Sequence, residues 1–214
     1  MVTARTRIKI CGLTREVDVD DAVEAGADAI GLVLYAKSPR AVTIGRAQAL
    51  AARLPPFVTP VLLFVNAPAD EVRTAALRIP QALLQFHGDE TAQDCAAAGR
   101  PYLRAARMTA GFDLLDFAGR FPEARALLLD AHVEGFGGGG KVFDWSIVPH
   151  GVPLPVVLSG GLSPANVIDG ITRVRPWAVD VSSGVESAKG IKDAALMRRF
   201  CQAVRQADAA LAPP

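Results

Sequence analysis

Short apolar runs rich in β-branched residues recur along the chain and alternate with alanine-rich segments of helical spacing. Runs of this kind predict buried strands, and the segments between them predict helices. The expected strands are residues 8–11, 29–34, 61–65, 82–86, 102–106, 126–130, 154–159 and 178–182. The expected helices are residues 16–26, 45–54, 69–79, 89–99, 163–174 and 192–211. The pattern is therefore a strand followed by a helix, repeated about eight times.

This alternation suits two α/β architectures, an open doubly wound sheet and a closed barrel. No Pro-, Ser- or Gly-rich linker divides the units, so we expect a single (βα)8 TIM barrel over residues 1–214. The chain is short for that fold, which typically has about 250 residues. We expect short flexible ends at about residues 1–6 and 209–214, with an unstructured segment leading up to Lys9.

Polar residues stand at the ends of several expected strands, where a barrel builds its active site. Cys11 ends the first strand, Gln85 and His87 end the fourth, and Asp130 ends the sixth. Alternation along a strand places Lys9 and Cys11 on one side of the first strand, and Gln85 and His87 together on the fourth. We therefore expect three strands to converge on one mouth.

Each of these residues also has a purely structural interpretation. A free cysteine is usually a small core hydrophobe, and this is the expectation for Cys95 and Cys201, which lie in predicted helices. Asp130 would serve as a helix or loop cap, and His87, which precedes "GDE", would satisfy a turn. The occurrence of Cys11, His87 and Asp130 together at strand ends favours a shared function.

Two Gly/Ser segments follow the last two expected strands. In "VVLSGGLSPANV" (156–167), Gly160 and Gly161 follow the strand, Ser163 suits an N-cap and Pro164 the first helical position. In "DVSSGVE" (180–186), hydroxyl and amide donors stand before another expected short helix, at Ser182, Ser183 and Gly184. Backbone N–H groups at helix starts bind phosphate, and these two loops are the usual phosphate site of a TIM barrel. Although the glycines alone are equally typical of tight turns, the paired loops predict a small phosphorylated ligand.

Composition narrows the class of protein. Hydrophobic residues make up 50% and charged residues 21%, and the formal net charge is +1, which argues against a disordered chain or a nucleic-acid surface. The apolar window at 57–65 is shorter than the roughly 20 residues of a membrane span, and the segment before Ile8 does not resemble a signal peptide. The three cysteines form no CxxC pair, so we expect no disulfide framework, no zinc site and a cytoplasmic location.

Motifs along nearly the whole chain, from Lys9 to Phe200, closely resemble the phosphoribosylanthranilate isomerase family of tryptophan biosynthesis. They occur in that family's order: "KICGLT", "KSPRAV", "LLQFHGDE", "LLLDA", "GGGGKVFDW", "VLSGGLSPANV", "VDVSSGVES" and "KGIKDAALMRRF". The motifs "KICG", "SSGVE" and "GKxFDW" are not general barrel features. The resemblance implies a (βα)8 barrel that performs an Amadori rearrangement without cofactor or metal. Its substrate would be N-(5-phosphoribosyl)anthranilate and its product 1-(2-carboxyphenylamino)-1-deoxyribulose 5-phosphate.

By this resemblance Cys11 is the general base, Asp130 the general acid, and Arg40 the residue that holds the anthranilate carboxylate. The phosphate would bind near Gly160, Gly161, Asp180, Ser182, Ser183 and Gly184, and we expect Lys9, Gln85 and His87 to contact the substrate. From the bare sequence, Arg40 would read as an ordinary solvated arginine. The partner is thus a small phosphorylated molecule, with no nucleic acid or membrane, and the sequence leaves the oligomeric state open.

The chemistry of the reaction agrees with these roles. Ring opening needs a proton on the ring oxygen, which a buried carboxylic acid such as Asp130 can donate. Loss of the C2 proton then needs a base, and a thiolate is competent if its pKa falls below the usual value of about 8.5. A nearby cation such as Lys9 would lower the pKa of Cys11.

The loop 134–141, "EGFGGGGK", contains the glycine run Gly137 to Gly140 and is expected to act as a mobile lid, or else as a plain surface connection. Family members usually interrupt this run with Thr or Ser where Gly139 stands here. A hydrogen bond from that hydroxyl is therefore not expected in this chain.

Three other functions suit parts of the pattern. A histidine-pathway phosphoribosyl isomerase would use an aspartate as base, which Cys11 argues against. A thiol enzyme would use Cys11 as a nucleophile with His87 as its base. A non-catalytic phosphate-binding barrel would need no acid and base across the mouth.

Overall fold

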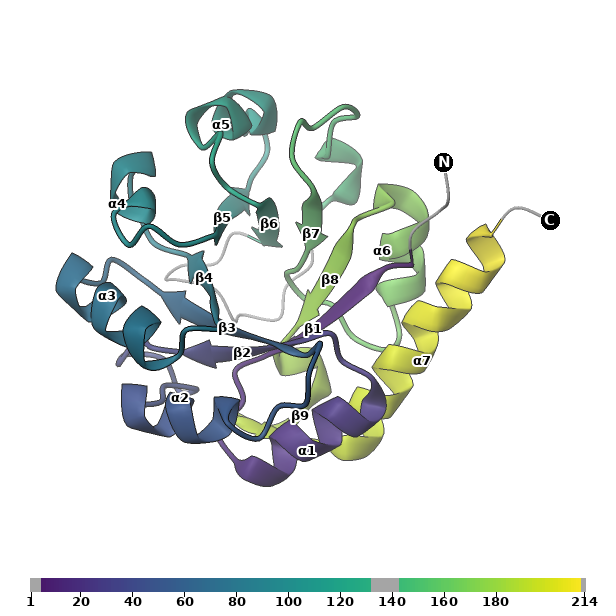
Figure 1. Cartoon of the computed structure of the whole chain (residues 1–214). Coiled ribbons are helices and arrows are strands. Elements are labelled where there is room, and N and C mark those ends of the chain that lie inside the picture. The colour runs from purple at the N-terminus through teal and green to yellow at the C-terminus, as the bar shows by residue number, and fades with distance from the viewer. Residues whose placement is uncertain (1–4, 132–142, 213–214) are drawn as a thin grey trace.

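The structure is a computed structural model that describes residues 5–131 and 143–212. Eight parallel strands hydrogen-bond in sequence order, and β1 pairs with β8 to close a barrel (Figure 1). The strands are β1 (Arg7–Cys11), β2 (Ala29–Val33), β3 (Thr59–Phe64), β4 (Leu83–Phe86), β5 (Tyr102–Met108), β6 (Ala126–Ala131), β7 (Val156–Leu158) and β8 (Ala178–Val181). The predicted TIM barrel is confirmed.

The helices surround the barrel on its outside (Figure 1). They are α1 (Glu16–Ala25), α2 (Ile44–Ala51), α3 (Ala69–Arg78), α4 (Ala92–Ala96), α5 (Leu114–Arg120), α6 (Val167–Val174) and α7 (Ala194–Leu211), with 3-10 turns η1 (Trp145–Ile147) and η2 (Ser183–Val185). A helix was expected after every strand. Between β6 and β7, the described residues contain only the 3-10 turn η1.

The strands are buried on both faces, which explains why they read as continuous apolar runs. One layer inside the barrel is apolar and consists of Val61, Leu103, Ala105, Ala126, Leu128, Val157 and Ala178. A second apolar cluster groups Cys11 with Val33, Leu63 and Val65. A larger core, which includes Ile10, Phe64 and Phe200, fills the space between the strands and the helices.

The ordered structure reaches closer to both ends than expected. Thr6 donates from its backbone N–H and its hydroxyl to the Asp208 carboxylate, at 2.9 and 2.6 Å, and Arg5 pairs with Asp28. The helix α7 continues to Leu211. Residues 5–6 and 209–211, expected among the flexible ends, thus make hydrogen bonds or belong to α7.

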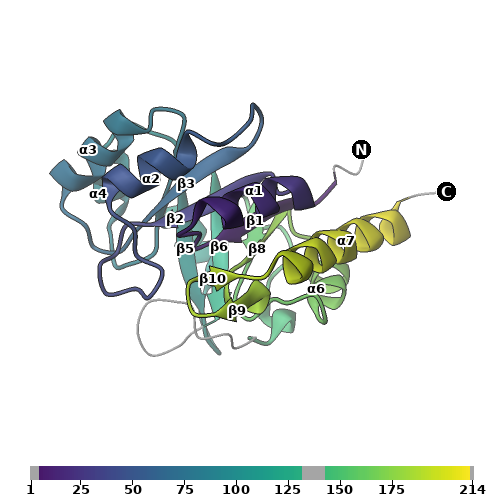
Figure 2. The same ribbon diagram turned by 90° about the horizontal axis from the view of Figure 1, so that it is seen from below.

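A short antiparallel hairpin, β9 (Glu186–Ala188) and β10 (Ile191–Lys192), follows η2 and was not expected. Figure 2 shows it on the side of the molecule away from the two chain termini. The Thr14 hydroxyl, just after β1, donates to the Gly190 carbonyl at 2.8 Å, so the hairpin is attached to the loop that follows Cys11. Among the described residues, no helix has the length and apolar character needed to cross a membrane.

Candidate active site

Cys11 lies at the C-terminal end of β1 and is buried. Its register partner on β2 is Gly31, where an added β-carbon would lie 2.5 Å from the Cys11 sulfur and 3.0 Å from its α-carbon. Only glycine leaves room for the thiol at this level of the barrel. The sequence of β2 therefore accommodates the position of Cys11.

Lys9 and Asp180 form an ion pair inside the barrel. Lys9 Nζ donates to Asp180 Oδ1 at 2.9 Å, and both side chains are almost fully buried. Burial opposes the charge on Lys9, but the attraction of Asp180 outweighs it, and the pKa of Lys9 is raised. The Asp180 carboxylate faces a lysine, which disagrees with its expected place among the phosphate ligands, since a carboxylate also repels phosphate.

The expectation that Lys9 lowers the pKa of Cys11 below its usual value is wrong for this structure. Burial raises the pKa of the thiol, and although Lys9 acts in the opposite direction, Asp180 adds to the increase. The Lys9 charge is largely compensated by Asp180, so it cannot offset the desolvation of the thiol. The surroundings of Cys11 therefore disfavour its thiolate.

Asp130 in β6 is connected to β4 through His87. Its Oδ2 lies 3.0 Å from His87 Nε2, and its Oδ1 accepts from the Ala131 N–H at 2.9 Å. On the other side of the imidazole, Gln85 Nε2 lies 3.3 Å from His87 Nδ1. Because an amide nitrogen only donates, Nδ1 accepts in this arrangement and Nε2 directs its proton to Asp130. The predicted group of Gln85, His87 and Asp130 is thus brought together.

The loop that carries His87 is held by a buried pair, Arg104 and Glu90, which was not predicted from the sequence. Arg104 donates to the carbonyls of Phe86 and Gly88, at 2.9 and 3.0 Å. Glu90 accepts from the N–H of Gly88 at 2.9 Å and lies 3.6 Å from Arg104. Burial lowers the pKa of Arg104 despite the nearby Glu90. These contacts hold His87 against Asp130.

Arg40 is buried and is not the solvated arginine that the bare sequence would suggest. Its Nε and Nη2 donate to the two carboxylate oxygens of Glu186, each at 2.7 Å. Lys192 Nζ donates to the same carboxylate at 2.8 Å and to the Ser182 carbonyl at 3.0 Å. Glu186 and Lys192 were not among the predicted site residues, although both lie in motifs of the family, "SSGVES" and "KGIK".

The two predicted phosphate loops lie against each other. An added β-carbon on Gly184 would overlap the Leu162 carbonyl, and one on Gly160 would overlap the Ala131 N–H. Gly160 and Gly161 both have positive φ, of 78° and 69°. Within the described part of the chain, the N–H groups of Gly160, Gly161, Ser183 and Gly184 make no hydrogen bond. These donors are available to an anion.

The predicted helix start in this region needs a correction. The helix α6 begins at Val167 with Asn166 as N-cap, and Ser163 and Pro164 lie in the preceding turn. Asn166 Oδ1 accepts from the Ser163 N–H at 2.8 Å, and its amide donates to the Gly161 carbonyl at 3.0 Å. The expected η2 turn after β8 is present at Ser183–Val185. The glycine run Gly137 to Gly140, expected as a lid, lies outside the described residues.

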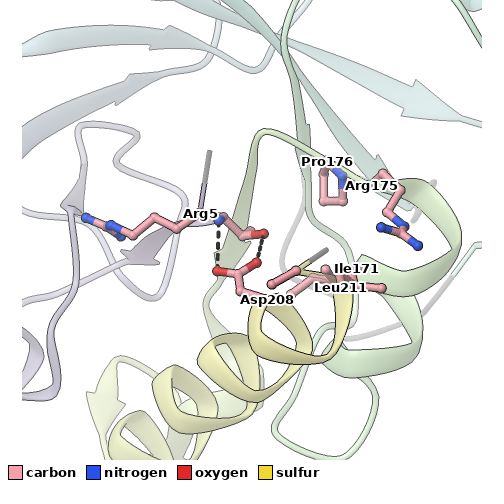
Figure 3. A pocket seen from close by; sticks show the side chains of 8 residues that line it. Arg5, Ile171, Arg175, Pro176, Asp208 and Leu211 are labelled. Atoms are coloured by element: carbon pink, nitrogen blue, oxygen red, sulfur yellow. Dashed lines mark hydrogen bonds between the residues drawn. The ribbon is translucent and has the colours of Figure 1, made fainter. Parts of the chain in front are cut away.

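A cavity of about 300 Å³ lies at the opposite end of the barrel, before β1 and β8 (Figure 3). Asp208 faces it but accepts both hydrogen bonds from Thr6, and the Arg5 side chain pairs with Asp28. Asp208 and Arg5 are therefore engaged by the protein, and Arg175, which also lines the cavity, donates from Nε to the Thr172 carbonyl at 3.2 Å. Among the described residues, no cluster of His, Cys, Asp and Glu has the geometry of a metal site.

Comparisons with known proteins agree with this geometry. The family model for N-(5'-phosphoribosyl)anthranilate (PRA) isomerase matches residues 8–203. The N-(5'-phosphoribosyl)anthranilate isomerase of Methylibium petroleiphilum is 73% identical, covering 97% of this chain and 98% of that protein. The enzyme of the same name from Leptothrix cholodnii is also 73% identical, over 96% of this chain and 94% of that one.

Solved structures are similar over almost the whole chain. Phosphoribosyl anthranilate isomerase from Thermotoga maritima has a TM-score of 0.87 and 38% identity, over 94% of this chain and 99% of that one. A phosphoribosyl anthranilate isomerase in complex with reduced 1-(o-carboxyphenylamino)-1-deoxyribulose 5-phosphate has a TM-score of 0.84 and 36% identity, with the same coverage.

Proposed function

The chain belongs to the N-(5'-phosphoribosyl)anthranilate isomerase family, and from this premise we propose how its own side chains divide the reaction. The chain is the isomerase of tryptophan biosynthesis that performs the Amadori rearrangement of N-(5-phosphoribosyl)anthranilate to 1-(2-carboxyphenylamino)-1-deoxyribulose 5-phosphate. Substrate and product have the same atoms, so the enzyme needs only to move protons.

Asp130 is the general acid of the first step. It gives a proton to the ring oxygen of the ribose while the nitrogen lone pair forms the imine bond, so the C–O bond breaks and the chain opens. His87 Nε2 lies 3.0 Å from Asp130 Oδ2 and orients this carboxyl group. Both carboxylate oxygens thus accept a hydrogen bond, Oδ1 from the Ala131 N–H and Oδ2 from His87 Nε2, and the proton given to the ring oxygen is carried on one of the remaining lone pairs.

Cys11 is the general base of the second step. It removes the proton from C2, the electrons of that C–H bond form the C1–C2 double bond of the enolamine, and the 2-hydroxyl then loses its proton as C1 gains one, which gives the ketone. Burial raises the pKa of the free thiol, so the substrate complex must provide the activation. The protonated imine places a positive charge beside the thiol, which favours the thiolate at the moment when it is needed.

Two further groups hold the substrate. The guanidinium of Arg40 binds the anthranilate carboxylate, since a planar fork of donors matches a carboxylate. The phosphate binds the free N–H groups of the Gly160–Gly161 and Ser183–Gly184 segments, with the Ser182 hydroxyl nearby. Asp180 then acts through Lys9 rather than on the phosphate.

The observation that carries this assignment is that Cys11 and Asp130 stand on β1 and β6, at the barrel end where the β7 and β8 loops present free N–H groups. The test is the turnover of freshly generated substrate by Cys11→Ser and Asp130→Asn, with binding of the reduced product as the control for folding. Loss of kcat with binding retained supports the roles. Near wild-type kcat in either variant would refute the role of that residue.

We propose that the enzyme works in the cytoplasm, where we expect its biosynthetic substrate to be made. Fractionation of cells that express the tagged chain tests this, and recovery of the activity in another compartment would refute it.

A further inference from the structure

Glu186, the first residue of β9, lies beside the proposed carboxylate site. Its buried carboxylate accepts two hydrogen bonds from Arg40, each at 2.7 Å, and one from Lys192 at 2.8 Å. We propose that Glu186 is a positioning residue, which fixes the Arg40 guanidinium so that the enzyme selects a substrate with a carboxylate on its aromatic ring. This inference rests on the proposed role of Arg40 in binding that carboxylate.

The guanidinium has two edges that can bind a carboxylate in bidentate fashion. Glu186 occupies the edge formed by Nε and Nη2. Residues 5–131 and 143–212 place no hydrogen-bond acceptor on the other edge, formed by Nη1 and the second hydrogen of Nη2, so we assign it to a ligand. Arg40 can therefore hold the protein carboxylate and the substrate carboxylate at the same time, and the plane of the first pair sets the direction of the second.

The aliphatic part of Arg40 is held from the other side by Gly12, which follows Cys11. An added β-carbon on Gly12 would overlap Cδ of Arg40. The side chain of Arg40 thus lies between the end of β1 and Glu186 and has little rotational freedom. A fixed guanidinium loses less entropy on binding than a mobile one, which increases both affinity and selectivity.

Lys192 completes the arrangement. Its side chain is fully buried, and it joins Glu186 to the Ser182 carbonyl in the proposed phosphate region. Burial alone would raise the pKa of Glu186. The hydrogen bond from Arg40 and the charge of Lys192 outweigh this effect, so the pKa is lowered, which favours the ionised carboxylate. With two cations and one anion, the group keeps one net positive charge for one substrate carboxylate.

Glu186 could position Arg40 or merely neutralise its charge, and the two roles predict opposite effects of Glu186 variants on the binding of a carboxylate. If Glu186 only neutralised Arg40, removing its charge would strengthen the binding of a carboxylate, because two cations would remain unopposed. If Glu186 positions Arg40, the same change weakens carboxylate binding. Glu186→Asp also separates the two roles, because it keeps the charge but draws the carboxylate back by one methylene. It weakens the binding of a carboxylate only if Glu186 positions Arg40.

The experiment measures Kd by calorimetry for two ligands, reduced 1-(2-carboxyphenylamino)-1-deoxyribulose 5-phosphate and the same compound without the ring carboxylate. The proteins are the wild type, Arg40→Ala, Glu186→Gln, Glu186→Asp and the double variant Glu186→Gln with Arg40→Ala. Glu24→Gln, at an exposed carboxylate of α1, controls for the loss of one charge. Binding of the ligand without carboxylate, through its phosphate, reports that each variant is folded.

We expect the wild type and Glu24→Gln to prefer the carboxylated ligand by about tenfold or more, the range of charged hydrogen bonds. Arg40→Ala loses this preference, both Glu186 variants lose most of it, and Glu186→Gln adds nothing in the Arg40→Ala background. If Arg40→Ala keeps the preference, the proposed role of Arg40 is wrong. If Arg40→Ala loses it but either Glu186 variant keeps or increases it, the positioning role of Glu186 is wrong while that of Arg40 stands.

Discussion

Replacing Asp180 with Asn is expected to destabilise the barrel strongly, because it leaves a buried ammonium without a counter-charge. Lys9 and Asp180 are 4% and 6% exposed, and Nζ lies 2.9 Å from Oδ1. Removing one partner of such a buried pair costs about 3–5 kcal/mol. That is a large part of the roughly 5–15 kcal/mol by which a typical domain is stable. Replacing Lys9 with Met as well should recover about 2 kcal/mol, since the uncompensated charge is then gone.

Urea denaturation followed by circular dichroism measures these differences. The matched control is Asp169→Asn, which breaks the exposed pair between Asp169 and Arg173, where the expected loss is about 0–1 kcal/mol. The reasoning is refuted if Asp180→Asn costs no more than this control. It is also refuted if the double variant is less stable than Asp180→Asn alone, because the cost would then not come from the unpaired Lys9.

Three further predictions concern the site. Because the pKa of Cys11 is raised, its thiolate absorbance should appear only above about pH 8.5, where an ordinary thiol ionises. Lys9→Met should raise this pKa further. Ionisation of Cys11 below the pH of an ordinary thiol would contradict the prediction. Gly184→Ala should abolish binding of the reduced product, because its methyl would overlap the Leu162 carbonyl, whereas Gly119→Ala, in open space, should bind normally. Glu90→Gln should lower kcat and speed amide exchange at Gly88, whose N–H it holds; exchange at the wild-type rate would refute this.

Most of the barrel could be predicted from periodicity alone. The run 8–11 corresponds to β1, Arg7–Cys11, and 178–182 corresponds to β8, Ala178–Val181. Strands that are buried on both faces leave a strong apolar signal, whatever their exact ends. The run 154–159 is longer than β7, Val156–Leu158, because Pro155 and the Ser159–Gly160 turn limit the regular pairing.

The alternation also predicted the grouping of Gln85 with His87 and of Lys9 with Cys11, since both depend only on the two-residue period of a strand. It could not predict partners across the barrel. Arg40 and Glu186 are 146 positions apart, and the hairpin that carries Glu186 has strands too short to show a period. Asp180 was expected near the phosphate, in the segment before Ser182 and Ser183, whereas its carboxylate accepts a hydrogen bond from Lys9.

We propose that this barrel isomerises its substrate with its own acid and base. The most direct measurement is the conversion of freshly generated N-(5-phosphoribosyl)anthranilate by the purified chain after extensive dialysis against a metal chelator, with Cys11→Ser as the comparison. We predict full activity of the dialysed wild type, with a kcat at least 100-fold lower for Cys11→Ser, roughly the lower end of what a general base contributes. Loss of wild-type activity that an added metal restores, or equal kcat for the two proteins, would contradict the account.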